Sequence, residues 1–161
     1  MGGSNNFFPI STITLTGTKA VSLSNDTVLS ADGGVSGGTI QINGGAQFTS
    51  QQSTISAREQ FGSGGTIQVE ARTVKLTDTQ LTTSTSDGPQ SVGGTITVDA
   101  QNPTLTNSQM LSTATEGQGG TITITSPIFH QDASSVIDAS SHSGTDGMVT
   151  IKGIIQPWAG P

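Results

Sequence analysis

The chain has 161 residues, of which 30% are hydrophobic and 10% are charged, and its net charge is −6. Its five Lys and Arg residues are scattered and form no basic stripe, which disfavours nucleic acid as a partner. The low charge argues against disorder driven by self-repulsion, and the absence of Cys excludes disulfides and thiolate metal sites. No apolar run approaches the roughly 18 residues of a membrane span, so we expect none.

The two ends of the chain differ in composition from the rest. Met1-Gly2-Gly3-Ser4 is typical of an expression start with a linker and suggests a fragment or a designed chain. We therefore expect residues 1–9 to be a flexible N-terminal segment, residues 10–155 to form one β-solenoid, and residues 156–161 to be a tail or cap. Trp158 lies in that tail and is expected to fold over the open strand edge of the last coil.

A degenerate repeat organises the segment between these ends. The block Gly-Gly-Thr-Ile occurs at residues 37–40, 64–67, 93–96 and 119–122, with weaker forms at 11–13 and 147–149. The apolar residues that mark the repeat stand 26 to 29 positions apart: Ile13, Ile40, Ile67, Ile96, Ile122 and Val149. A fixed period of this length indicates stacked coils, so these six side chains are predicted to form one internal row.

Each period predicts three short strands. Apolar and polar residues alternate after the marker, as in Ile67-Gln68-Val69, which is the two-residue period of a half-buried strand. The second strand is predicted about eight residues after the marker, at Val21, Leu23, Phe48, Val74, Leu76, Leu105, Ile128 and Phe129. The third is predicted about 15 residues after it, with Val28, Ile55, Leu81, Leu111 and Ile137 in the core.

Gly, Ser and Asp occupy the predicted corners. The Gly-rich turns that lead into each repeat are expected to supply the φ > 0 conformations of a tight corner. The longer spacing before Ile96 is attributed to a corner at residues 86–90. Side chains expected to cap backbone N–H groups at corners are Asp78, Asp87, Asp132 and Asp146. The fold class is therefore all-β, a parallel β-helix with three strands and about 27 residues per coil and five to six coils, with almost no helix, because Gly disfavours one.

The coil motifs resemble a known family. Gly-Gly-Thr-Ile-Gln-Ile at residues 37–42, Gly-Gly-Thr-Ile-Thr-Val at 93–98 and the segment at 105–114 are similar to coil repeats of filamentous-haemagglutinin-like exoproteins of bacterial two-partner secretion. The resemblance covers roughly residues 11–155 and implies a right-handed parallel β-helix in a secreted or surface-held adhesin, with an outer-membrane transporter for the parent protein. Neither a signal peptide nor the family's Asn-Pro-Asn-Gly type motifs is present, so we expect a coil segment without its export signal.

Polar residues beside the marker row predict a surface ladder. Its members are Thr12, Thr14, Thr39, Gln41, Thr66, Gln68, Thr95, Thr97, Thr121, Thr123 and Thr150. Thr residues two apart on strands that stack at about 4.8 Å form a flat lattice of hydroxyl and methyl groups, which resembles ice-binding solenoids. The long side chains of Gln41, Gln68 and Met148 interrupt this lattice, and Thr is in any case favoured on exposed strands.

A carboxylate pair is the strongest candidate for chemistry. Glu70 and Asp99 each follow their marker by three residues, so adjacent coils are expected to hold them about 5 Å apart. This spacing suits a retaining glycosidase or, with Asn43, a Ca²⁺ site. Solvation of both acids at a corner is the preferred explanation, so no catalytic or metal-binding residue is predicted. His130 and His142 lack metal-motif spacing and are expected at the surface.

The residues and the resemblance together predict a non-enzymatic structural or adhesive segment, without cofactor or metal. Its expected partners are host or matrix glycans or proteins, and self-association through its open ends is a further expectation. An ice-binding solenoid that uses the Thr ladder is the first alternative, and a solenoid that binds or degrades polysaccharide is the second.

Overall fold

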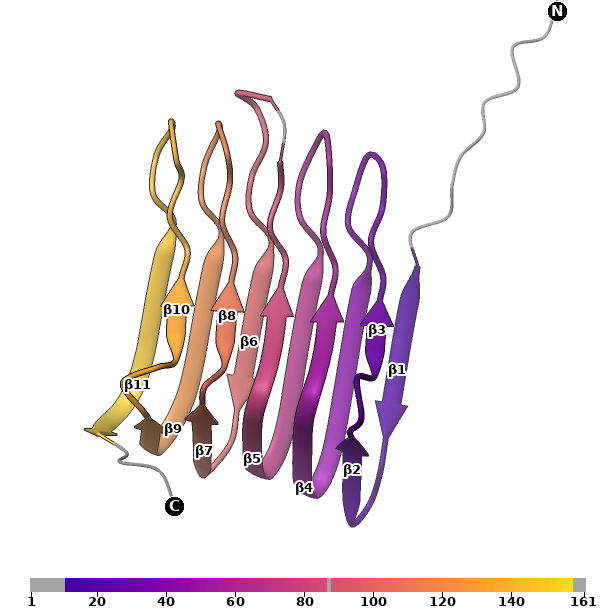
Figure 1. The fold of residues 1–161 in the computed structure, drawn as a ribbon, viewed down its shortest axis with the longest axis vertical. Coiled ribbons are helices and arrows are strands. Elements are labelled where there is room, and N and C mark those ends of the chain that lie inside the picture. The colour runs from indigo at the N-terminus through magenta and orange to yellow at the C-terminus, as the bar shows by residue number, and fades with distance from the viewer. Residues whose placement is uncertain (1–10, 87, 158–161) are drawn as a thin grey trace, which may run out of the picture.

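The computed structural model describes residues 11–86 and 88–157. Within these ranges the chain forms eleven parallel strands of one sheet that winds around a common axis, and no helix that could cross a membrane (Figure 1). The strands are β1 (Thr12–Thr16), β2 (Ala20–Leu23), β3 (Val28–Ser30), β4 (Thr39–Ser56), β5 (Thr66–Thr82), β6 (Thr95–Asp99), β7 (Asn102–Thr106), β8 (Gln109–Leu111), β9 (Thr121–Gln131), β10 (Val136–Asp138) and β11 (Met148–Pro157). The expected flexible start, Asp87 and the Trp158 cap lie outside the described residues.

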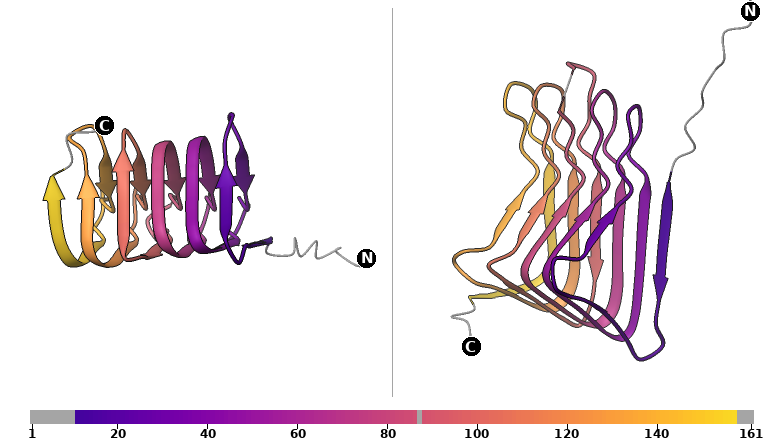
Figure 2. Two further views of the ribbon diagram at one scale, coloured as in Figure 1. Left: turned by 90° about the horizontal axis from the view of Figure 1, so that it is seen from below. Right: turned by 45° about the vertical axis from the view of Figure 1, so that its right-hand side comes forward.

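Each coil has three walls, one for each predicted strand. β1, β2 and β3 are separate in the first coil, whereas β4 and β5 continue around the corners of the next two coils (Figure 2). The first wall contains β1, β6 and the N-terminal parts of β4, β5, β9 and β11. The parallel β-solenoid of about 27 residues per coil is therefore confirmed.

The predicted internal row is confirmed by the strand register. Its neighbouring pairs are Ile13 with Ile40, Ile40 with Ile67, Ile67 with Ile96, Ile96 with Ile122, and Ile122 with Val149. The four central side chains are fully buried, whereas Val149 is 42% exposed. Val149 lies on β11, and no other described strand covers the far side of β11.

Two predicted core residues of the third wall were wrong by one position. Val28 is 64% exposed and Leu111 is only half-buried, whereas Leu29 and Met110 face the core. Because side chains alternate along a strand, an error of one residue exchanges the inner and outer faces.

The corner between the second and third walls sets this phase. In four successive coils the corner residue has a positive φ, and the inward residue follows three positions later. The corner residues are Asp26, Gln52, Asp78 and Asn107. The inward residues are Leu29, Ile55, Leu81 and Met110, and they are paired in register across the coils.

Each coil closes at a neck where the first and third walls meet backbone to backbone. The second Gly of each pair, or Gly147 in the last repeat, donates its N–H to a small residue across the neck. These bonds are Gly38 to Ala31, Gly65 to Ala57, Gly94 to Thr83, Gly120 to Ser112 and Gly147 to Ala139, at 2.6–2.9 Å. Beyond the neck the chain protrudes as a narrow loop, visible at the top of Figure 1.

Positive φ was expected in the Gly-rich turns that lead into each repeat, and among the described glycines of these turns it occurs only at Gly88. Positive-φ glycines among the described residues are Gly45, Gly88 and Gly153, and none of them belongs to a Gly-Gly-Thr-Ile block. The motif glycines instead allow close approach, since a Cβ on Gly65 would lie 2.0 Å from the carbonyl oxygen of Gly38. The absence of a side chain is what permits the neck.

The additional residues before Ile96 lie in the third protruding loop, as predicted. Thr85 pairs with Ala114 and Val92 pairs with Gln118. Residues 85–92 of this coil therefore connect the same two bridges as residues 114–118 of the next coil, and they are the longer segment. Extra length is accommodated here because the loop projects from the solenoid and does not interrupt the stacked walls (Figure 1).

Candidate functional site

The outward side chains of the first wall form three rows across six strands, and we call this surface the threonine face. Its first row is Thr12, Thr39, Thr66, Thr95, Thr121 and Met148; its second is Thr14, Gln41, Gln68, Thr97, Thr123 and Thr150; its third is Thr16, Asn43, Glu70, Asp99, Thr125 and Lys152. All residues of the predicted ladder therefore lie together in the first two rows. Whether this ladder binds a ligand stays a prediction.

The rows of the threonine face differ in regularity. The first row contains five consecutive Thr residues and ends at Met148, which is 63% exposed. In the second row, Gln41 and Gln68 are exposed neighbours in register and separate one Thr from three others. The face therefore offers hydroxyl, methyl and amide groups, about 4.8 Å apart along each row and about 6.7 Å apart along each strand.

The register brings the predicted carboxylates together at one edge of this face. Glu70 pairs with Asp99, and Asn43 pairs with Glu70 from the coil on the other side. Both carboxylates are exposed, and Arg72 lines the same open depression of about 290 Å³. No group of three or more His, Cys, Asp or Glu side chains suited to a metal occurs in the part of the chain that is described. Catalysis or Ca²⁺ binding at this edge is the minor alternative that the sequence raised, and nothing in the structure tests it.

A groove that the sequence reasoning missed runs along the corner between the second and third walls, and we call it the axial groove. One side is the row of positive-φ corner residues Asp26, Gln52, Asp78 and Asn107. The other side is the outward row Val28, Thr54, Gln80 and Gln109 of the third wall. The groove encloses about 570 Å³, and the coils bend in step along it (Figure 2).

Hydrogen bonds between coils order the walls of the axial groove. Asn107 Nδ2 donates to Asp78 Oδ1 at 2.6 Å, and Gln80 Nε2 donates to Gln109 Oε1 at 3.1 Å. Both bonds run parallel to the solenoid axis because each joins equivalent residues of adjacent coils. The sequence signal for this groove is an Asp, Asn or Gln three positions before the inward residue of the third wall, present in the first four coils.

Buried hydroxyl groups form the floor behind these side chains. The Thr79 hydroxyl, 2% exposed, donates to Ser50 Oγ at 3.0 Å, and the Thr79 N–H donates to Ser108 Oγ at 3.1 Å. The Ser108 N–H in turn donates to Ser135 Oγ. Satisfied buried hydrogen bonds of this kind rigidify a site, so the groove keeps its shape without a ligand.

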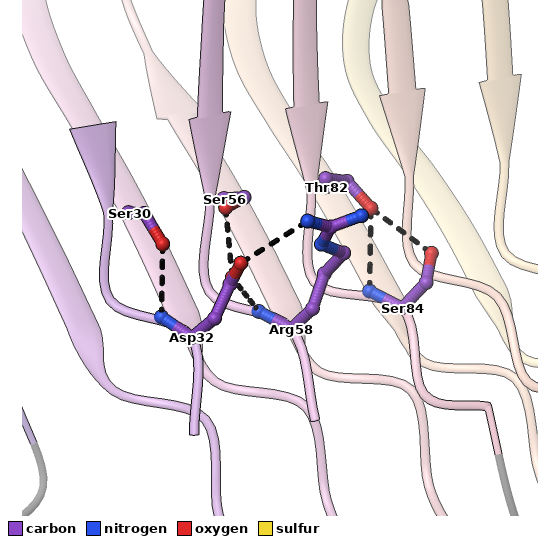
Figure 3. Close-up of polar contacts among 6 residues, drawn as sticks. All are labelled: Ser30, Asp32, Ser56, Arg58, Thr82 and Ser84. Atoms are coloured by element: carbon purple, nitrogen blue, oxygen red, sulfur yellow. Dashed lines mark hydrogen bonds and ion pairs between the residues drawn. The ribbon is translucent and has the colours of Figure 1, made fainter. Parts of the chain in front are cut away.

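Two carboxylates, Asp32 and Asp132, accept hydrogen bonds from residues of a neighbouring coil, and Figure 3 shows Asp32. Burial alone would raise the pKa of Asp32, but the Arg58 N–H, the Ser56 hydroxyl and the Arg58 guanidinium outweigh burial and keep this pKa below its usual value. The guanidinium lies 3.2 Å from Asp32 Oδ2. Asp32 therefore joins two coils at the entrance to the neck.

The predicted capping role is confirmed for Asp132 and Asp146. Asp132 accepts hydrogen bonds from the N–H groups of Asn107 and Ser135, and Asp146 accepts one from the N–H of Ser141. Burial would raise the pKa of Asp132, but hydrogen bonds from Ser134, Ser135 and Asn107 lower it. Asp78 differs from the expectation, because it accepts a side-chain amide and no backbone N–H from the described residues.

The two histidines lie apart from these surfaces. His142 is exposed in the last protruding loop, whereas His130 is half-buried on β9, paired in register with Thr104 and Gln156. The surface placement predicted for both thus holds for His142 and only partly for His130.

The fold and these surfaces define a parallel β-solenoid that presents repeated polar side chains along its length. No protein-family model, curated protein or solved structure matches the chain. Its functional assignment therefore depends on the threonine face and the axial groove.

Proposed function

We propose that this solenoid is a non-enzymatic structural and adhesive segment of a secreted or surface-exposed bacterial protein. The observation that supports this proposal is the threonine face, whose outward residues stay in register across six strands. The secretion route by an outer-membrane transporter follows from the resemblance of the coil motifs to filamentous-haemagglutinin-like exoproteins. Host or matrix glycans or proteins are the proposed partners.

The chemistry of the face suits a broad surface contact. Its first two rows contain no charged side chain, and its charged residues Glu70, Asp99 and Lys152 lie in the third row at one edge. Short hydroxyl side chains lose little conformational entropy when a partner covers them. Each contact is weak, but the repeat multiplies it along the partner, and linked weak contacts raise the overall affinity.

Binding of immobilised glycans and matrix proteins tests this function. Thr95→Lys with Thr97→Lys places two cationic chains in the middle of the threonine face, and we expect binding to fall at least tenfold. Thr104→Lys with Thr106→Lys is the matched control, because these two Thr residues of β7 are also half-buried and two apart, on the second wall. No binding by the parent chain, or equal loss in both variants, would contradict adhesion through this face.

Ice binding is the second candidate, and the unbroken row of five Thr residues supports it. The matching lattice is interrupted in the next row by Gln41 and Gln68, so we rank adhesion first. Thermal hysteresis of the purified chain distinguishes the two. Freezing-point depression that disappears in the Thr95→Lys and Thr97→Lys variant would establish ice binding, and its absence in the parent chain would remove this candidate.

A further inference from the structure

We infer that the axial groove is a second binding site, which takes one linear neutral glycan chain laid parallel to the solenoid axis. This site lies on the corner between the second and third walls, away from the threonine face. The inference goes beyond adhesion through that face, because it assigns a different surface and one class of ligand. The two can fail separately.

The extent of the groove indicates a chain and not a single small molecule. Its lining residues come from five successive coils, from Asp26 in the first to Ser134 in the fifth. At about 4.8 Å per coil, these five positions span roughly 20 Å along the axis. The groove is therefore long enough for several monomers in a row and too open to enclose one compact ligand.

The hydrogen-bonding groups of the groove suit hydroxyl-rich ligands. Gln80 and Gln109 use one donor and one acceptor on each other, and no described residue contacts Gln80 Oε1 or Gln109 Nε2 by a hydrogen bond. An amide carries two donor hydrogens and a carbonyl oxygen, so this pair still offers both donors and acceptors. A sugar hydroxyl needs both, because it donates one hydrogen bond and accepts others.

The charge of the groove selects against acidic polymers. Asp26 and Asp78 are carboxylates in its lining, and no Lys or Arg is among the described residues that line it. An anionic glycan or a nucleic acid would bring like charges together here, without the cationic contacts that phosphates need. A neutral chain avoids this repulsion, and each Asp can accept hydrogen bonds from its hydroxyls.

The repeat distance favours a glycan over an extended polypeptide. Equivalent side chains of the groove recur about every 4.8 Å, whereas an extended peptide advances about 3.3 Å per residue and loses register within a few residues. A pyranose unit of a linear glycan is close in length to one coil step, so each coil can meet the hydroxyl groups of about one unit. Val28, 64% exposed at one end of the groove, offers an apolar contact to a sugar ring.

Titration of the intact chain with neutral oligosaccharides tests the inference. The probes are cello-, laminari- and malto-oligosaccharides of two to eight units, followed by calorimetry or NMR shifts, with polygalacturonate and gelatin peptides for comparison. We expect at least one neutral series to bind, with an affinity that rises to four or five units and then levels off. The acidic polymer is expected to bind at least tenfold more weakly.

Three paired variants locate the site. Gln80→Ala with Gln109→Ala removes the amide pair of the groove and is expected to weaken binding at least tenfold. Gln41→Ala with Gln68→Ala removes two neighbouring Gln residues from the threonine face and tests that surface instead.

Gln47→Ala with Gln118→Ala is the matched control for both pairs. These two Gln residues are exposed and line neither the groove nor the threonine face, so this variant is expected to change nothing. Unchanged thermal unfolding of all three variants shows that the fold survives.

Specific outcomes would overturn the inference. They are no binding by any neutral series, stronger binding of polygalacturonate or gelatin peptides, or equal effects of the groove variant and the Gln47→Ala and Gln118→Ala control. Loss of binding only in the Gln41→Ala and Gln68→Ala variant would move the glycan to the threonine face and leave the adhesive function standing. Loss only in the groove variant would support the inference even if the threonine face binds nothing.

Discussion

Substitution of Gly65 by Ala should destabilise the solenoid, because the neck leaves no room for a side chain. The new Cβ would lie 2.0 Å from the Gly38 carbonyl oxygen and 2.9 Å from the Ala57 Cβ. Relief requires the backbone of two coils to separate by more than 1 Å, since ordinary contacts begin near 3.4 Å. That movement also strains the bonds from Gly65 N–H to Ala57 and from Thr66 N–H to Gly38, at 2.7 and 2.9 Å.

The expected cost follows from these contacts. Overpacking costs roughly 1–3 kcal/mol, and each weakened hydrogen bond adds about 1 kcal/mol. The unfolding free energy should therefore fall by about 3 kcal/mol or more. For a domain of this size, such a loss lowers the melting temperature by roughly 6–12 °C.

Gly34→Ala is the matched control for this measurement. No atom lies within 4 Å of the Cβ that this change adds, because Gly34 lies in the first protruding loop. We expect its melting temperature to equal that of the parent chain or to rise slightly, as Ala restricts the unfolded chain. Thermal unfolding followed by circular dichroism compares the two. If Gly65→Ala melts within about 2 °C of Gly34→Ala, the close-approach explanation of the repeated glycines is wrong.

Two further predictions concern the core phase and the acid stability. Met110→Ala should lower the free energy of unfolding by about 2–5 kcal/mol and Leu111→Ala clearly less, because Met110 is fully buried and Leu111 is half-buried. Urea unfolding measures both losses, and the reverse order would contradict the assigned register. Asp32 and Asp132 have lowered folded-state pKa values, so the stability they contribute is present above the unfolded-state pKa of about 3.9 and is lost as pH falls through their folded-state pKa. The Asp32→Asn and Asp132→Asn double variant should be less stable than the parent at pH 7 and should lose less stability between pH 5 and pH 2; parallel stability curves over this pH range would show that these carboxylates do not contribute.

The repeat period and the two-residue alternation were enough to predict the stacking of the coils. Ile13 through Val149 could be placed in one row because every first-wall strand starts from the same Gly-Thr-Ile type motif, and parallel stacking preserves the register. The alternation around each marker also assigned the threonine face, since outward residues of stacked strands must fall in rows. These features are local or strictly periodic, so a sequence carries them directly.

Other features depend on contacts between segments that the period does not describe. Leu29 and Met110 face the core because a positive-φ corner residue sets the phase of the third wall in their coils, and side-chain alternation alone is compatible with either phase. The axial groove arises only when this corner is repeated in adjacent coils, which places Asp78 against Asn107 and Gln80 against Gln109.

The glycines of the Gly-Gly-Thr-Ile blocks show both cases, because the sequence predicted their positions and only the structure explains why they are glycines. Their spacing was visible in the sequence and correctly indicated the number and position of the coils. Their role in the close backbone approach at the neck depends on tertiary structure, because the residues across the neck, such as Ala57 opposite Gly65, come from the other end of the coil. Period and alternation thus determined the stack of coils, whereas corner geometry and backbone approach across each coil decided its core phase, its neck and its groove.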